Sequence, residues 1–183
     1  RLTLRRWKPD DLDHFASMNA DSRVMRYFPS TLDRSESENL LAKIESHFEE
    51  HSFGFWALEK RADGAFIGFT GLAKVPFESP FTPAVEIGWR IAFEHQGQGL
   101  ATEAANAAVK FGFEELQLRE IVSFTVLDNL PSRRVMEKLG MVTRRQENFA
   151  HPRLPPDHPL SEHVLYRLAR LDWDRAATAY NSM

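Results

Sequence analysis

Two glycines, Gly97 and Gly99, place the strongest constraint on how this chain can fold. They lie in residues 96–101, Gln-Gly-Gln-Gly-Leu-Ala, between a run that alternates like a strand and a run with helical periodicity. Glycine lets a backbone approach another group closely, and the amides of a turn and of a helix N-terminus can converge on an anion. This segment, the glycine turn, predicts a strand-turn-helix unit. The turn either binds a phosphate or only shapes a tight connection.

Two common nucleotide motifs do not fit the glycine turn. A Walker loop needs Gly-Lys followed by Ser or Thr, which is absent. A dinucleotide fingerprint needs Gly or Ala at the position of Thr102. A phosphate at this turn would therefore be held by main-chain amides without a lysine side chain.

Periodicity predicts a single α/β domain over residues 1–183, without an internal repeat. Strands are expected at residues 2–7, 53–59, 66–73, 85–91, 120–126, from 141 and at 163–168. Helices are expected from residue 9, from residue 33, over 102–116 and over 131–139. Asp33 and Glu36 have the spacing of a capping box, and residues 62–64 predict a hairpin turn.

The composition narrows the class of protein. With 43% hydrophobic residues the chain can bury a core, and without cysteine it can form neither disulfides nor an enzyme thioester. A net charge of −3 with interspersed signs argues against a general nucleic-acid binder. No run approaches the roughly 18 apolar residues of a membrane span. We expect a soluble, cytoplasmic protein without nucleic-acid or membrane partners and, because the sequence begins with Arg1, a few residues before it.

Three sequence blocks resemble a known family. Residues 96–101 read as Gln-x-x-Gly-x-Ala directly after Glu-Ile-Gly-Trp-Arg at residues 86–90, and this order resembles the acetyl-CoA motif of the GNAT acetyltransferase superfamily. Further similarity, specifically to the RimJ/RimL-like branch, lies in residues 101–104, 128–133 and 137–141. Three blocks in the family's order and spacing are a strong signal.

The resemblance implies the GNAT acyl-CoA N-acyltransferase fold, a mixed and mostly antiparallel sheet flanked by helices and splayed between the strands at 85–91 and 120–126. It also implies acetyl-CoA as co-substrate, with pantetheine along the strand edge at residues 89–91. The cofactor-binding residues that it implies are Trp89, Arg90, Ile91, Gln96, Gly97, Gln98, Gly99, Leu100, Ala101, Thr102, Asn129 and Ser132.

Transfer to an amine needs a base, because a lysine-type amine with a pKa of about 10.4 is mostly protonated at neutral pH. Glu86 is the candidate, acting directly or through a water. The other interpretation of Glu86 is a strand carboxylate paired with a surface arginine. Main-chain amides near residues 89–91 are the expected donors to the thioester oxygen.

The start of the helix predicted at 131–139 carries two more candidates. Ser132 occupies the position where RimL-like relatives have a hydroxyl that protonates the departing thiolate, and Asn129 matches the residue that binds pantetheine in the family. The alternative is structural, with Asn129 as N-cap and Pro131 in the first turn. Tyr166 is the one late alternative for the proton donor, and packing is its simpler role.

Residues 148–159 form a loop rich in proline and histidine. His151, His158 and His163 match no zinc spacing, so no metal is predicted. In the fold that the resemblance implies, the stretch before the last strand faces the substrate, and the loop is expected to wall the acceptor site. Three aromatic residues either line the same site or belong to the core: Phe28, Phe53 and Phe55.

These features together predict an N-acetyltransferase that moves an acetyl group from acetyl-CoA directly to a primary amine in a ternary complex. The amine belongs either to a protein N-terminus or to a small molecule. The competing classes are a non-catalytic acyl-CoA-binding module and a purely structural domain. The oligomeric state is expected to be monomer or homodimer.

Overall fold

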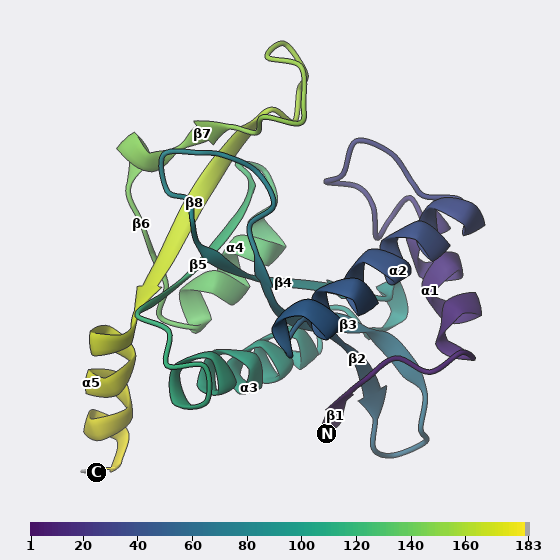
Figure 1. The fold of residues 1–183 in the computed structure, drawn as a ribbon, viewed down its shortest axis with the longest axis horizontal. Helices are drawn as coiled ribbons and strands as arrows, with labels where there is room; N and C mark the ends of the chain where they lie inside the picture. Colours follow the sequence, from purple (N-terminus) through teal and green to yellow (C-terminus); the bar gives the residue numbers. More distant parts are fainter. Residues whose placement is uncertain (182–183) are drawn as a thin grey trace. The chain divides into compact units, whose positions relative to one another are not determined.

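The computed structural model describes residues 1–181, with side chains described for residues 1–175. The chain divides into two compact units. The first unit holds residues 1–73 and 88–108, and the second holds residues 74–87 and the chain from residue 109 on. Strand β4 (Val85–Ile91) and helix α3 (Leu100–Glu114) each have residues in both units. Figure 1 shows the ribbon coloured along the sequence.

Three strands of the first unit form an antiparallel ladder. β1 (Leu2–Arg5) pairs with β2 (Phe55–Lys60), and β2 pairs with β3 (Phe66–Lys74). β3 also bonds to β4, since Thr70 Oγ1 donates to the Gly88 carbonyl at 2.9 Å. The predicted hairpin turn between β2 and β3 is confirmed.

Helices α1 (Asp11–Ala20) and α2 (Arg34–His51) lie side by side in the first unit (Figure 1). The predicted capping box is confirmed, because Asp33 and Glu36 each accept the other's main-chain N–H at 2.8 Å. Burial of apolar side chains from both helices and from β3 stabilises this arrangement. The buried members of the cluster are Phe15, Met18, Val24, Ile44, Phe48 and Phe69.

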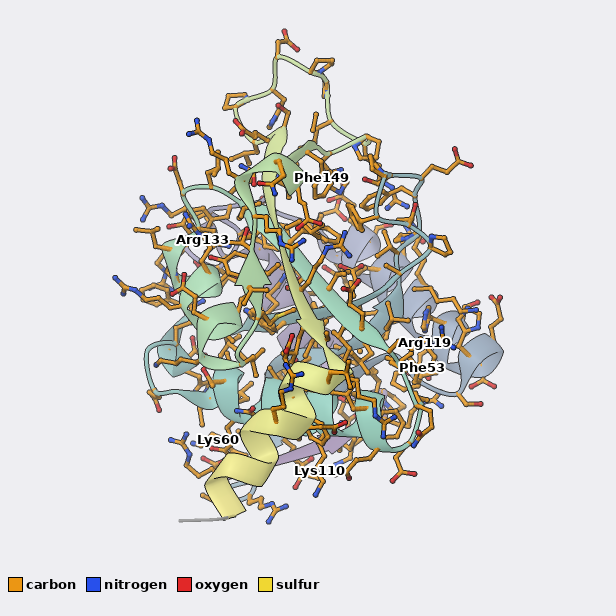
Figure 2. All side chains as sticks on the ribbon, turned by 90° about the vertical axis from the view of Figure 1, so that its left-hand side faces the viewer. Phe53, Lys60, Lys110, Arg119, Arg133 and Phe149 are labelled. Atoms are coloured by element: carbon orange, nitrogen blue, oxygen red, sulfur yellow. The ribbon has the colours of Figure 1, made fainter. Side chains whose placement is uncertain are left out.

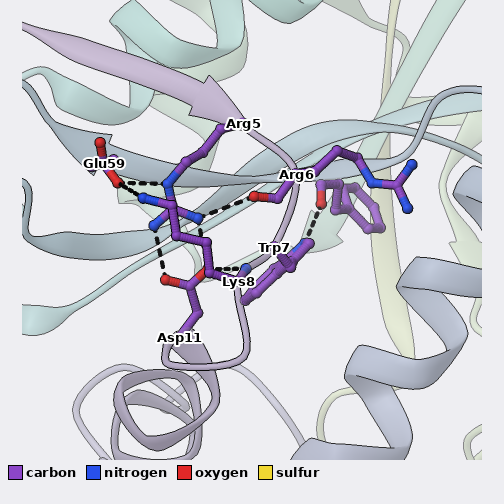
Figure 3. Close-up of polar contacts among 7 residues, drawn as sticks. Arg5, Arg6, Trp7, Lys8, Asp11 and Glu59 are labelled. Carbon is purple, nitrogen blue, oxygen red and sulfur yellow. Dashed lines mark hydrogen bonds and ion pairs between the residues drawn. The ribbon is translucent and has the colours of Figure 1, made fainter.

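An ion-pair cluster joins β1, β2 and the start of α1 (Figure 3). Arg5 donates from Nη1 and Nη2 to the two Asp11 carboxylate oxygens at 2.6 and 2.8 Å, and from Nε to Glu59 at 2.6 Å. The Asp11 side chain is only 5% exposed, and it also accepts the Lys8 N–H at 2.8 Å. Bidentate, charge-assisted bonds of this kind fix the direction in which the chain enters α1.

The second unit is built around β5 (Glu120–Val126), which pairs antiparallel along its length with β8 (Glu162–Ala169). β5 meets β4 in parallel, with Glu86 opposite Val122. Two short strands pair antiparallel with β8, namely β6 (Val142–Thr143) and β7 (Phe149–Ala150). Through β4 the strand order is β1-β2-β3-β4-β5-β8-β6, with β7 on β8.

Helix α4 (Leu130–Lys138) follows β5 along the chain, and helix α5 (Arg170–Asn181) follows β8 directly. Single turns of 3₁₀ helix lie at η1 (Phe93–His95) and η2 (Arg145–Glu147). The largest fully buried side chains of the second unit form its core: Tyr166, Phe113, Ile87, Ile121, Met136, Leu165, Val109 and Val122.

The predicted fold class is confirmed, a mixed and mostly antiparallel sheet with helices, and β4 and β5 have the predicted bounds. β2 begins two residues later than predicted, because Ser52 ends α2 at a φ of 63° and Gly54 lies against the Phe48 ring. α3 begins two residues earlier than predicted, directly after the positive φ of Gly99.

One strand and one α-helix were not predicted, β7 inside the loop at 148–159 and helix α5, and neither were the 3₁₀ turns η1 and η2. A single domain over residues 1–183 stays a prediction, and its last two residues lie outside the described part of the chain. Among residues 1–181, no helix combines the length and the apolar character needed to cross a membrane.

Candidate functional site

The glycine turn lies in the first unit, and its last two residues, Leu100 and Ala101, begin α3. Gly97 and Gly99 have φ of 72° and 77°, in the left-handed region that favours glycine. A Cβ at Gly97 would meet no atom within 4 Å, and one at Gly99 would meet only the Arg1 side chain, at 3.7 Å. Residues 96–99 are exposed. The main chain of the turn is therefore open to a close neighbour.

All amides of this turn except that of Gln96 have no acceptor within the described part of the chain. Gln96 N–H donates to the Phe93 carbonyl at 3.1 Å, and Glu103 N–H donates to the Gly99 carbonyl at 3.1 Å. The N–H groups between them, from Gly97 to Thr102, make no hydrogen bond to a described residue. Such amides at a helix start carry partial positive charge. The turn thus has the chemistry to hold phosphate groups.

Side chains of the predicted cofactor residues shape the turn. Gln96 Nε2 donates to the Ile91 carbonyl and Gln98 Nε2 to the Glu94 carbonyl, both at 2.9 Å. The Arg1 guanidinium donates to the Gln98 carbonyl at 3.1 Å. Leu100 is buried in the same apolar cluster as Ile91, and Ala101 packs against that cluster.

Trp89 and Ile91 lie at the edge of β4 that β3 does not occupy. The Gly88 carbonyl faces β3, where it accepts a hydroxyl hydrogen bond, and the Arg90 carbonyl is so close to Gly68 that a Cβ there would approach it to 2.1 Å. Main-chain groups of neighbouring strand residues point to opposite edges. Trp89 and Ile91 therefore direct their N–H groups away from β3, as the predicted oxyanion and pantetheine contacts require.

Glu86 belongs to the second unit and is half-buried. Burial raises the pKa of Glu86 to about 7, against the opposing effect of the Arg153 charge. Among the described residues, Glu86 makes neither a hydrogen bond nor an ion pair. Arg153 itself donates to the Pro76 carbonyl at 2.8 Å and stacks over the Phe77 ring at 5.8 Å. The carboxylate is therefore unpaired and titrates near neutral pH.

Six half-buried rings form an aromatic cluster in the second unit, with centroids of contacting pairs 4.7 to 6.3 Å apart. Its members are Phe77, Phe81, Phe124, Phe149, His151 and His163. Phe149 and His151 come from the start of the loop at 148–159, and Figure 2 labels Phe149 there. Burial lowers the pKa of His151 to about 4 and also lowers that of His163, so both rings are neutral at pH 7.

The start of α4 supplies the two remaining candidates. The Asn129 carboxamide caps the helix, accepting Ser132 N–H at 3.3 Å and donating to Thr125 Oγ1 at 2.9 Å. Ser132 is half-buried, and its hydroxyl has no partner among the described side chains and main-chain groups. The hydroxyl is therefore available to donate a proton, whereas Asn129 already has a structural role.

Tyr166 is 1% exposed and serves packing, as the simpler interpretation predicts. Its hydroxyl donates to Glu137 on α4 at 3.0 Å and accepts from Arg133 at 3.2 Å. Of the three aromatic residues predicted near the acceptor, Phe53 is buried and Phe55 packs against the core of the first unit, while Phe28 is 39% exposed. Within the described residues, no group of three or more His, Cys, Asp or Glu could hold a metal.

No sequence pattern indicated two features of the site. The aromatic cluster unites rings from four separate segments, so no local pattern marks it. The half-buried Arg90 side chain lies beside Asn19 and Phe28 in the first unit, and these partners are too distant in the sequence for a local pattern to indicate the contact.

A comparison with known families decides the assignment. A family profile described as "Acetyltransferase (GNAT) domain" matches residues 1–142. This chain belongs to the GNAT acetyltransferase family. The match includes the glycine turn and both Glu86 and Ser132.

Individual GNAT relatives cover most of the chain. "Uncharacterized N-acetyltransferase YnaD" of Bacillus subtilis (strain 168) is 28% identical over 174 residues, 95% of this chain and 96% of that protein. "FsC-acetyl coenzyme A-N(2)-transacetylase" of Aspergillus fumigatus is 36% identical over 127 residues, 67% of this chain and 53% of that protein. A GNAT-family acetyltransferase structure from Bacillus anthracis is 26% identical, with a TM-score of 0.75, and the alignment covers 93% of this chain and 96% of that one.

Proposed function

We propose that this GNAT protein transfers an acetyl group from acetyl-CoA directly to a primary amine. The observation that carries the proposal is the run of unpaired amides from Gly97 to Thr102 on an exposed turn before a long helix. Two phosphates joined as a pyrophosphate match such a row of donors, and no side-chain cation is needed. Three motif blocks support the finer assignment to the RimJ/RimL-like branch, and a cytoplasmic location stays a prediction.

Each remaining chemical role has a candidate residue in this chain. Glu86, with a pKa raised to about 7, is partly ionised at neutral pH and suited to take a proton from the amine. The Trp89 N–H, directed away from β3, is a donor for the thioester oxygen. Ser132 has an unengaged hydroxyl that can protonate the thiolate, and the amides of residues 97–102 hold the phosphates. The thioester supplies the activated acetyl group.

Binding is tested by thermal unfolding with acetyl-CoA and with S-acetylpantetheine, which lacks the pyrophosphate. Acetyl-CoA at ~100 times its Kd should add about 2.7 kcal/mol of stability. S-acetylpantetheine at the same concentration should add much less, because it cannot use the glycine turn. Equal shifts for the two compounds would contradict the phosphate assignment, and no shift with acetyl-CoA would favour a purely structural domain.

Catalysis is tested by CoA release with a panel of primary amines that includes peptides with free N-termini. We expect release with at least one acceptor and an acetylated amine of the corresponding mass. Binding of acetyl-CoA without release for any amine would support the alternative, a non-catalytic acyl-CoA-binding module.

A further inference from the structure

The Arg90 side chain in the first unit is half-buried, and its guanidinium has no negative partner among the described residues. Its Nη1 donates to Asn19 Oδ1 at 2.6 Å, which is its one hydrogen bond to a described residue. Arg90 Nε is inaccessible to solvent and makes no hydrogen bond. No carboxylate of the described residues lies within ion-pair distance of this group. A buried charge of this kind normally has an opposite charge beside it.

The groups around Arg90 hold it in place. Asn19 is fully buried, and its Nδ2 donates to Ser37 Oγ at 3.1 Å, which directs its Oδ1 toward Arg90. The Asn19 carbonyl accepts the Leu32 N–H at 3.0 Å, so the segment between α1 and α2 is anchored to the same residue. The guanidinium is therefore positioned by three elements, α1, α2 and β4.

Aromatic rings complete the surroundings of the guanidinium. The Arg90 Cζ lies 4.3 Å from the centroid of Phe28 and 5.4 Å from that of Phe69. Phe28 is 39% exposed, so on the side of the guanidinium that faces Phe28 a single ring separates it from solvent. Burial lowers the pKa of Arg90 to about 10, which leaves the group charged at neutral pH. Aromatic faces stabilise a cation but do not neutralise it.

We propose that Arg90 recognises an oxyanion, a carboxylate or a phosphate, carried by the amine acceptor. This inference rests on the proposed function, because it assigns one feature of the acceptor of that reaction. The anionic part of CoA is not the natural partner of Arg90. The open amides at residues 97–102 account for the pyrophosphate, and the residues that surround Arg90, from α1, β3 and the segment before α2, carry no part of the cofactor motif.

The test compares acceptors that carry an oxyanion with matched acceptors that lack it. CoA release is measured with amino acids and their matching amides, and with phosphoethanolamine and ethanolamine. One charge-assisted hydrogen bond gives a preference of about tenfold to a hundredfold in kcat/KM for the anionic member of a pair. In Arg90→Gln that ratio should fall toward one, and in Arg90→Lys, which keeps the charge, it should be retained in part. The amino acid pairs and the phosphate pair separate the two sources of the oxyanion.

A second measurement does not depend on turnover. Calorimetry in the presence of CoA compares N-acetylated amino acids with their amides, for the wild type and for Arg90→Gln. We expect the carboxylate to bind at least about tenfold more tightly in the wild type alone. Thermal unfolding without ligand establishes that the variant is folded.

The two proposals fail in distinguishable ways. If no amine releases CoA, the proposed function fails, and calorimetry still decides the role of Arg90. If amines are acetylated but the anionic member of no pair is preferred, or if the preference persists in Arg90→Gln, the Arg90 inference is overturned and the proposed function stands.

Discussion

The side-chain amide of Gln96 donates a hydrogen bond to the main-chain carbonyl of Ile91 at 2.9 Å. This bond ties the glycine turn to the last residue of β4, five residues earlier. The amides that we assign to the phosphates therefore depend for their position on a side chain that need not touch the ligand. Such indirect positioning explains how a glutamine can matter in a motif whose contacts are made by the main chain.

Gln96→Ala should weaken acetyl-CoA binding about tenfold, because loss of one partly buried hydrogen bond frees the turn. Asn106→Ala is the matched control. Asn106 also donates a side-chain amide hydrogen bond to a main-chain carbonyl, that of Thr102 at 3.0 Å, but it is exposed on the surface of α3. Calorimetric titration with acetyl-CoA measures both variants. Equal affinities of Gln96→Ala and the wild type for acetyl-CoA would show that the hydrogen bond from Gln96 to Ile91 does not position the turn.

Local sequence signals predicted the elements that are bounded by proline or glycine residues or are rich in β-branched and aromatic residues. β4 follows a proline-containing loop and ends before the glycine turn, and β5 is a short run of β-branched and aromatic residues, so both had the right bounds. Helix α5 was missed because it follows β8 without a turn residue or a capping signal. β7 is two residues long, below the length at which alternation can be recognised.

The part of the candidate site that depends on main-chain groups could be predicted from the sequence, and the environments of its side chains could not. The glycine turn needs its two glycines, and these are visible in the sequence. The environments of Glu86 and Arg90 depend on distant residues, since Arg153 acts on Glu86 and Asn19 bonds to Arg90 across 71 positions. Periodicity contains no information on such pairs.

Gly99→Val should abolish acetyl-CoA binding while the protein stays folded. Valine is strained at a φ of 77°, and its branched side chain would occupy the open side of the turn amides. The control is Gly64→Val in the hairpin turn, where φ is 73° and a Cβ meets no atom within 4 Å. The two substitutions impose similar backbone strain, so loss of the acetyl-CoA thermal shift in Gly99→Val alone isolates the effect on the ligand.

Ser132→Ala should lower turnover more than acetyl-CoA affinity, by about tenfold or more, if the hydroxyl protonates the thiolate. The cap of α4 is kept in this variant, because Asn129 accepts the main-chain N–H of residue 132. Ser132→Thr retains a hydroxyl and should recover most of the rate. Steady-state CoA release gives kcat and KM for each. An unchanged kcat in Ser132→Ala would exclude Ser132 as the proton donor and leave it only a structural role at the start of α4.

Asp11→Asn should destabilise the protein by about 2 kcal/mol at neutral pH, because the half-buried Arg5 guanidinium loses its bidentate partner and keeps only Glu59 as a carboxylate partner. Asp13→Asn is the matched control on the same helix. Asp13 pairs with Arg34, but both side chains are more than half exposed, and the denaturation midpoint should barely move.

The cost of Asp11→Asn should depend on pH. Burial raises the pKa of Asp11, but hydrogen bonds from Arg5 and from the Lys8 N–H outweigh it and leave that pKa below its usual range. A lowered folded-state pKa stabilises the fold above the unfolded pKa of about 3.9, and this contribution is lost as pH falls through the folded value. Urea denaturation should therefore show wild type and variant converging below about pH 4. A constant difference down to pH 2 would contradict the ion-pair explanation.

Glu86 should give CoA release a pH dependence centred near 7. The carboxylate must be ionised to accept a proton, so the rate should rise as pH increases through about 7 and fall about tenfold per unit below it. Glu86→Gln should lower the rate by about 10²-fold or more and remove this limb, while a rise from deprotonation of the free amine persists at higher pH. Glu78→Gln, an exposed glutamate of the same unit, is the control and should keep the limb.

Stability separates a catalytic loss in Glu86→Gln from a structural one. The folded pKa of Glu86 lies above its unfolded value, so the ionised carboxylate costs stability, and this cost grows as pH rises from about 4.5 to 7. Glutamine removes that cost, and the variant should therefore unfold no earlier than the wild type at pH 8. A variant that is fully stable, binds acetyl-CoA and still shows the wild-type rate profile would exclude Glu86 as the base.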